Sequence, residues 1–204
     1  MTAFFHHGDR LRLREFGAAD AADIQHLHAD PRVRALLPDE QPLHEARWAE
    51  EFATRLGDFY RRHPGLGIWR CAVPLNDGEE RFAGWFSLMP LKASPGTAEL
   101  GSRLLPEHWG SGLSLQGGEV LLQHGFETLA LNTVWGICHP DNRGARVCLE
   151  ALGFMPRQRA LYEGQPADYH ALDAATWSAV RTLGRRERLR QARRAGGPST
   201  LAIP

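Results

Sequence analysis

The chain has 204 residues, of which 43% are hydrophobic and 24% charged, and its equal numbers of basic and acidic side chains give a formal net charge of zero. This length and composition are typical of one folded domain and exclude a chain that is disordered throughout. A chain without net charge also lacks the overall field that draws a protein to nucleic acid or to an anionic membrane.

In chain order, alternating apolar residues predict a first strand, and apolar residues at helical spacing then predict two helices with a break at Asp30-Pro31. Three short strands follow, separated by turn sequences rich in Gly, Pro and Asn. We expect the first strand at Leu11–Phe16, the helices at Asp20–Ala29 and Leu43–Arg62, and the three strands at Leu66–Val73, Arg81–Met89 and Thr97–Leu105.

The second half begins with a glycine-rich turn, Trp109–Gly112, which opens a helix running to about Ala130. Residues 184–204 are rich in Arg, Gly and Pro, and we expect them to form a disordered basic tail. Together the elements predict a mixed α/β structure in which antiparallel strands lead into parallel pairing. The remaining elements are expected as a strand at Thr133–His139, a helix at Asn142–Leu152 ended by Gly153, strands at Phe154–Tyr162 and Asp168–Leu172, and a short helix to about Leu183.

The cysteines and the apolar stretches indicate a cytoplasmic protein. Three cysteines do not make a disulfide framework, so a reducing compartment is expected. The first ten residues lack the apolar segment of a signal peptide, and no window approaches the roughly 18 apolar residues that a membrane span needs. Ten histidines occur without the spacing of metal ligands, so we expect no metal site.

The segment Leu104–Ser114 carries the main chemical signal, because Gly110 and Gly112 stand directly before a helix. Amide groups at a helix N-terminus can converge on a phosphate, helped by the positive end of the helix dipole. The segment has no lysine for a Walker loop, and Leu115 stands where a Rossmann fingerprint needs its third glycine. Taken alone, Gly-x-Gly fits a plain strand-to-helix turn equally well.

A second motif lies about thirty residues further on. His139-Pro140-Asp141-Asn142 precedes a helix that closes with Leu152-Gly153-Phe154, and either Asp141 or Asn142 can cap that helix. With the glycine turn, this pattern resembles the GNAT superfamily of acetyltransferases, and within it the RimJ/RimL-like branch, which carries a Q/R-x-x-G-x-G/A loop and an H-P-x-N strand end. The resemblance covers about residues 9–181. It implies one GNAT domain, a mixed central sheet with splayed parallel strands flanked by helices.

The resemblance also implies an activity, the transfer of an acetyl group from acetyl-CoA to a primary amine by direct attack. The family's Q/R position is Glu107 here, and a carboxylate cannot donate a hydrogen bond to phosphate. The positions that carry over to acetyl-CoA are Gly110, Ser111, Gly112, Leu113 and Ser114 for the pyrophosphate, Leu104 and Leu105 for the pantetheine arm, Asn142 beside the pantetheine and acyl end, and Arg146 for the nucleotide phosphate.

Glu99 is the candidate general base, because it resembles the glutamate that many family members use on the strand before the loop. A solvated or ion-paired strand glutamate is the alternative. The positions of the family's acidic tyrosine and serine hold Leu149 and Ala145, which cannot give a proton. A general acid therefore stays open among a water and four side chains, namely Cys148, Tyr162, Tyr169 and His139.

The expected partner is an amine, either a protein N-terminus or a small molecule, and the sequence leaves a homodimer open. Because the general acid is missing, a non-catalytic acyl-CoA-binding module is one rival. A second rival is a ribosome- or RNA-associated protein that acts through the basic stretch Arg185–Arg194. We do not expect the domain itself to bind nucleic acid.

Overall fold

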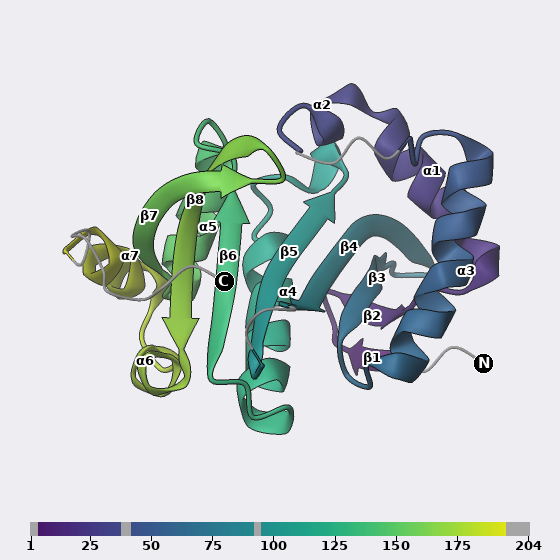
Figure 1. The fold of residues 1–204 in the computed structure, drawn as a ribbon. Coiled ribbons are helices and arrows are strands. Elements are labelled where there is room, and N and C mark those ends of the chain that lie inside the picture. The colour runs from purple at the N-terminus through teal and green to yellow at the C-terminus, as the bar shows by residue number, and fades with distance from the viewer. Residues whose placement is uncertain (1–3, 38–41, 92–94, 195–204) are drawn as a thin grey trace. The chain divides into compact units, whose positions relative to one another are not determined.

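The strands of the computed structural model are hydrogen-bonded in the order β1-β2-β3-β4-β5-β6-β8-β7, within described residues 4–37, 42–91 and 95–194 (Figure 1). The parallel ladder between β5 (Thr97–Leu104) and β6 (Thr133–Cys138) is short, joining Thr97–Glu99 to Thr133–Trp135. A ladder this short agrees with the splayed parallel strands that the resemblance implies. The mixed sheet with flanking helices confirms the expected α/β class.

The chain divides into two compact units. Unit 1 comprises Met1–Leu88 and Ser102–Gly117, and unit 2 comprises Met89–Gly101 and Gly118–Pro204. The first strands of unit 1 pair antiparallel in sequence order. They are β1 (Phe4–His7), β2 (Arg12–Glu15), β3 (Gly67–Pro74) and β4 (Glu80–Pro90).

The helices of unit 1 follow the apolar spacing that the sequence shows. Helix α1 packs against α3, and their buried side chains, such as Ile24 and Leu56, recur at helical intervals. Pro31 does not merely break the chain, because it opens a further short helix whose N-cap is Asp30. The elements are η1 (Ala18–Asp20), α1 (Ala21–Ala29), α2 (Pro31–Arg34), α3 (Ala46–Arg62) and η2 (Pro106–His108).

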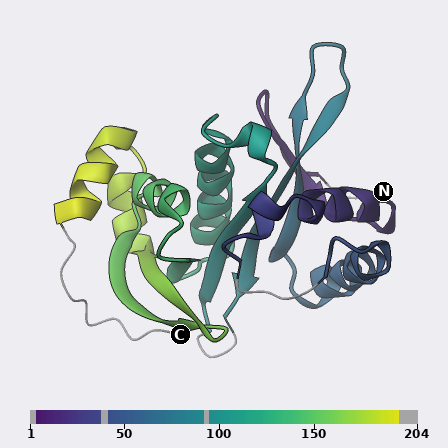
Figure 2. The same ribbon diagram turned by 90° about the horizontal axis from the view of Figure 1, so that it is seen from above.

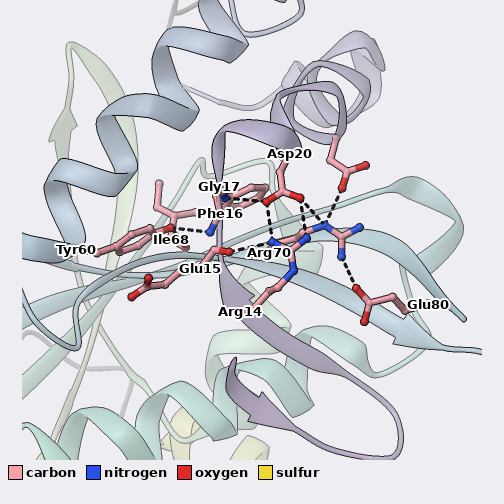
Figure 3. A network of polar contacts seen from close by, with 10 residues as sticks. Arg14, Glu15, Phe16, Gly17, Asp20, Tyr60, Ile68, Arg70 and Glu80 are labelled. Atoms are coloured by element: carbon pink, nitrogen blue, oxygen red, sulfur yellow. Dashed lines mark hydrogen bonds and ion pairs between the residues drawn. The ribbon is translucent and has the colours of Figure 1, made fainter. Parts of the chain in front are cut away.

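A network of ion pairs joins the strands of unit 1 to its first helices (Figure 3). Arg14 donates two hydrogen bonds to Asp20, at 2.6 and 2.7 Å. The buried Arg70 donates to Asp23 at 2.7 Å and to Glu80 at 2.9 Å. Burial would raise the pKa of Asp20, but the hydrogen bonds and the charge of Arg14 lower it. These charges therefore stabilise the folded strands and helix rather than facing solvent.

Unit 2 contains the rest of the sheet, and β7 and β8 form a hairpin in which β7 is strongly curved (Figure 1). Asn142 caps α5 by accepting a hydrogen bond from the Ala145 amide, and Gly153 ends it with a left-handed φ of 100°, as expected. The remaining elements are α4 (Leu113–Gln123), which begins in unit 1, then η3 (His124–Thr128), α5 (Arg143–Leu152), β7 (Met155–Tyr162), β8 (Gln165–Asp173), α6 (Ala174–Val180) and α7 (Arg185–Arg194).

The structure differs from the expected disorder of residues 184–204, because Arg185–Arg194 form α7, which packs on α5 (Figure 2). Arg188 explains the difference: its side chain is only 7% exposed and pairs with Glu119 at 2.8 Å. Burying a charged side chain costs free energy unless a group of opposite charge pairs with it. Residues 195–204 lie outside the described part of the chain.

Within the described residues, no helix is both long enough and apolar enough to cross a membrane.

Candidate functional site

The glycine turn lies in unit 1, where η2 leads from β5 to the start of α4. Gly110 has φ of 73° and Gly112 has φ of 87°, so both adopt the left-handed backbone that other residues rarely adopt. A Cβ atom added to either glycine would meet no atom within 4 Å. The backbone conformation therefore requires the glycines, and the space beside the turn is open.

Side chains around the turn hold it in place. Ser111 Oγ donates to the His108 carbonyl at 2.7 Å and accepts from the Leu113 amide at 3.3 Å. Trp109 Nε1 donates to the Leu104 carbonyl at 2.8 Å, which braces the turn against β5. The amides of a first helical turn have no carbonyl partner within the helix. The Ser111 amide also donates within the turn, to the His108 carbonyl at 3.4 Å. A phosphate in the open space would therefore be held by the other amides of the turn.

Some backbone groups of the two leucines before the turn already form hydrogen bonds within the protein. Leu105 donates its amide to the Ala83 carbonyl at 2.9 Å, and the Leu104 carbonyl accepts from Trp109. Both side chains are buried. A ligand chain along these residues would therefore have to use their other backbone groups.

Arg10 reaches the turn from the loop between β1 and β2. Its Nη2 donates to the Ser111 carbonyl at 3.5 Å, although 101 residues separate the two in sequence. Motif reasoning did not single out Arg10, because nothing in the local sequence links the two segments. It brings a positive charge to a turn whose Q/R position holds the exposed Glu107.

In unit 2, the candidate base Glu99 has a defined neighbour. Tyr162 Oη donates to Glu99 Oε2 at 2.8 Å, and both side chains are half-buried. Burial, followed by the negative charge of Glu99, raises the pKa of Tyr162 well above its ordinary value. Tyr162 therefore keeps its proton at neutral pH and acts on the carboxylate as a neutral hydrogen-bond donor.

The other residues expected around the cofactor lie on α5. Asn142 uses Oδ1 for the helix cap at 3.0 Å, so its amide NH₂ is the part that can donate elsewhere. Arg146 stands one turn later and is half-buried. Its charge contributes to the lowered pKa of Asp168, which is caused mainly by a hydrogen bond from Arg159.

The position where the family carries its acidic tyrosine is a packing position here. Leu149 is buried against Gly136. A Cβ atom added to Gly136 would lie only 2.3 Å from Leu149 Cδ2. Burial raises the pKa of Cys148 to about 11, so this thiol stays protonated at neutral pH. The pKa of Tyr169 is also raised, first by burial and then by the charge of Glu99. Among the described residues, no group of three His, Cys, Asp or Glu side chains could hold a metal ion.

The chain is similar to several known proteins. The uncharacterized N-acetyltransferase YoaA of Bacillus subtilis (strain 168) is 24% identical over 164 residues, which cover 78% of this chain and 90% of YoaA. The ribosomal-protein-S5-alanine acetyltransferase of Vibrio fischeri has a similar structure, with a TM-score of 0.70 and 17% identity over 86% of this chain and 98% of that one.

RimL, a ribosomal L7/L12 alpha-N-protein acetyltransferase in complex with coenzyme A, has a TM-score of 0.71 and 15% identity over 85% of this chain and 99% of that one. At these identities the two structures establish the fold alone. A model described as an acetyltransferase (GNAT) domain matches residues 10–155, more than half of the chain. The family expected from the motifs is therefore confirmed: the chain belongs to the GNAT acetyltransferases and is an N-acetyltransferase of that family.

Proposed function

We propose that this protein transfers an acetyl group from acetyl-CoA to a primary amine, and that the segment Gly110–Ser114 holds the diphosphate of the cofactor. The observation that carries the proposal is the pair of left-handed glycines before α4, with open space where side chains would otherwise stand. Without a Cβ atom, the backbone amides can approach phosphate oxygens closely. When bound, acetyl-CoA supplies the thioester carbonyl that the amine attacks.

Further groups contribute to cofactor binding in this proposal. The remaining backbone groups of Leu104 and Leu105 bind the pantetheine arm, and the Asn142 amide donates beside the acyl end. Arg146 pairs with the nucleotide phosphate. Arg10, whose guanidinium already lies 3.5 Å from the Ser111 carbonyl, offsets the phosphate charge that Glu107 cannot.

Glu99 acts as the general base. A primary amine is an ammonium ion near neutral pH and must lose a proton before it can attack a carbonyl carbon. A half-buried carboxylate can accept that proton, directly or through a water molecule. The departing thiolate needs no fixed acid, because an ordinary thiol has a pKa of about 8.5 and its anion is a tolerable leaving group. The substitution of the family's tyrosine by the packed Leu149 is therefore compatible with turnover.

The acceptor belongs to one of two classes, a protein N-terminus or a small-molecule amine. The names of RimL and of the Vibrio fischeri enzyme support the first class, since both describe acetylation of ribosomal proteins. Thiol release from acetyl-CoA, measured with a panel of N-terminal peptides and small amines, separates the two. Tight coenzyme A binding with no release for any amine would contradict the proposed reaction.

Calorimetric titration with coenzyme A tests the role of the glycine turn. In Gly112→Ala the free turn is expected to relax out of the left-handed region, and binding must restore it at a strain of about 1–2 kcal/mol, so the dissociation constant should rise about five- to thirtyfold. Gly78→Ala is the matched control, because Gly78 has φ of 88° and equally open surroundings, but lies between β3 and β4. Equal effects of the two substitutions on affinity would remove the turn from the binding site.

A further inference from the structure

The contact between Tyr162 and Glu99 depends on side chains from four neighbouring strands of unit 2. Glu99 on β5 stands opposite Trp135 on β6 in the parallel ladder. Trp135 meets Tyr169 of β8 edge to face, with ring centroids 6.3 Å apart. Tyr169 meets Tyr162 of β7 in the same manner at 6.4 Å, and Tyr162 completes the circuit by donating to Glu99.

The aromatic part of this circuit is firmly packed. Trp135 is 3% exposed and Tyr169 is 5% exposed, and Tyr169 Oη donates to the Leu161 carbonyl at 3.2 Å. Edge-to-face contacts between aromatic rings stabilise the packing beyond the area that the rings bury. The Tyr162 ring is therefore held on a rigid support, and its hydroxyl has little freedom to leave the carboxylate.

The hairpin turn fixes the register of Tyr162. Glu163 has φ of 48° and Gly164 has φ of 80°, and Tyr162 pairs with Gln165 across these two residues. Two left-handed residues in succession are typical of the type I′ turn, whose twist matches that of the strands beside it. Tyr162 is thus the last residue of β7 before a tight turn, where a shift by one residue would point its ring to the other face.

We propose that Tyr162 is a positioning residue for Glu99: its hydroxyl binds one carboxylate oxygen, holds the carboxylate in place and favours its charged form. This inference rests on the base role of Glu99 in the proposed function and adds a residue to it. A neutral donor stabilises the carboxylate without neutralising it, so Glu99 remains able to take up a proton.

Two other titratable groups lie near Tyr162, namely Tyr169 and Glu163. Tyr169 lies next to Tyr162, but its hydroxyl donates to the Leu161 carbonyl instead of to Glu99. Glu163 is exposed at the turn, and its charge, like that of Glu99, adds to the burial that raises the pKa of Tyr162. Both influences keep the proton on Tyr162, so it remains a donor over the range in which Glu99 titrates.

Tyr162→Phe tests the inference, because it removes the hydroxyl and keeps the ring. The carboxyl carbon of Glu99, followed by carbon-13 NMR and assigned by its absence from the Glu99→Gln spectrum, should titrate at higher pH in Tyr162→Phe than in the wild type. Tyr169→Phe is the matched control, since it removes a hydroxyl from the neighbouring ring that binds a carbonyl instead. The control should leave the Glu99 titration where it is.

An unchanged Glu99 titration in Tyr162→Phe, or an equal shift in both variants, would overturn the inference. The enzymatic counterpart is the pH profile of kcat/KM, whose acidic limb should move to higher pH in Tyr162→Phe, with a loss of about tenfold below the wild-type midpoint. A merely structural role would lower the rate without moving that limb, and that result also counts against the inference.

The NMR comparison does not depend on turnover. If Glu99→Gln kept full activity, the base role in the proposed function would fail, whereas the two tyrosine variants would still decide whether Tyr162 controls the carboxylate.

Discussion

Two carboxylates of this protein, Asp20 in unit 1 and Glu99 in unit 2, are both withdrawn from solvent, and the contacts that hold them differ. Asp20 accepts two hydrogen bonds from the Arg14 guanidinium and one from the Gly17 amide at 2.8 Å, and it lies 3.6 Å from Arg70. Glu99 accepts from the neutral Tyr162 hydroxyl.

The difference shows how its neighbours can suit a carboxylate either to stabilising the fold or to accepting a proton. Guanidinium groups offset the charge of Asp20 and lower its pKa against the effect of burial, so the group is hard to protonate and holds the fold together. The phenol of Tyr162, whose pKa is raised, gives Glu99 a hydrogen bond from a donor that stays neutral. Asp20 cannot take up a proton without loss of stability, whereas a carboxylate in the base role proposed for Glu99 must take one up.

The largest effect is expected from Glu99→Gln, which removes the proton acceptor and nearly preserves the shape. General base catalysis contributes roughly 10²–10⁴-fold, so kcat should fall by that order. Asp20→Asn is the matched control in unit 1, and its folded fraction should keep the wild-type kcat. Steady-state kinetics, with circular dichroism to count folded protein, checks both. A similar kcat for the two variants would erase the distinction between the carboxylates.

The second effect concerns stability. Arg70→Met removes a guanidinium that is 10% exposed and takes from Asp23 and Glu80 their ion pairs at 2.7 and 2.9 Å, so the free energy of unfolding should fall by about 3–5 kcal/mol. Arg32→Met is the control, because Arg32 is 66% exposed in its pair with Asp30 and should contribute far less to stability than Arg70. Urea unfolding measures both values. Comparable losses would show that the unit 1 network does not stabilise the fold.

A smaller effect is expected when pH is lowered. The pKa of Asp20 is lower in the folded than in the unfolded chain, so the unfolded chain binds more protons between the two values. The stability that Asp20 contributes is complete above the unfolded pKa of about 3.9 and is lost as pH falls through the folded value. The stability difference between wild type and Asp20→Asn should therefore shrink from pH 6 to pH 3. A constant difference would mean that ionisation of Asp20 does not matter.

Local sequence signals predicted the parts of this molecule that depend on neighbouring residues. The glycine turn, the Asn142 cap and the left-handed Gly153 each follow from a residue type that a particular backbone conformation demands. Most of the strands and helices followed from their apolar period for the same reason.

Contacts between distant segments could not be predicted in this way. Tyr162 and Glu99 are 63 residues apart, and their meeting depends on the order of four strands and on the register of a hairpin. The composition of residues 184–194 resembles a disordered tail, because nothing local reveals that Arg188 finds Glu119 69 residues earlier. The resemblance to a family named Glu99 as the candidate base, but it did not indicate that Tyr162 lies beside it.

The comparison also applies to two arginines, Arg70 and Arg10. The smallest effect is expected from the substitution of Arg10. Arg70 is buried among carboxylates and serves the fold, whereas Arg10 is exposed beside the glycine turn and touches only a carbonyl there, at 3.5 Å. Exposed ion pairs are worth about 0.2–1 kcal/mol, so Arg10→Ala should weaken coenzyme A binding up to about fivefold without changing stability.

Salt dependence makes this last expectation specific to charge. The Debye length falls from about 30 Å at 0.01 M to about 3 Å at 1 M salt, so the loss of affinity in Arg10→Ala should be clear at low salt and vanish at high salt. Pantetheine, which lacks the diphosphate, should bind wild type and variant equally, and Arg55→Ala on the exposed side of α3 should leave coenzyme A affinity unchanged. If pantetheine lost affinity as well, Arg10 would act through the shape of the turn. An arginine that acts on phosphate must lose its effect when salt screens the phosphate charge or when the ligand lacks the phosphate.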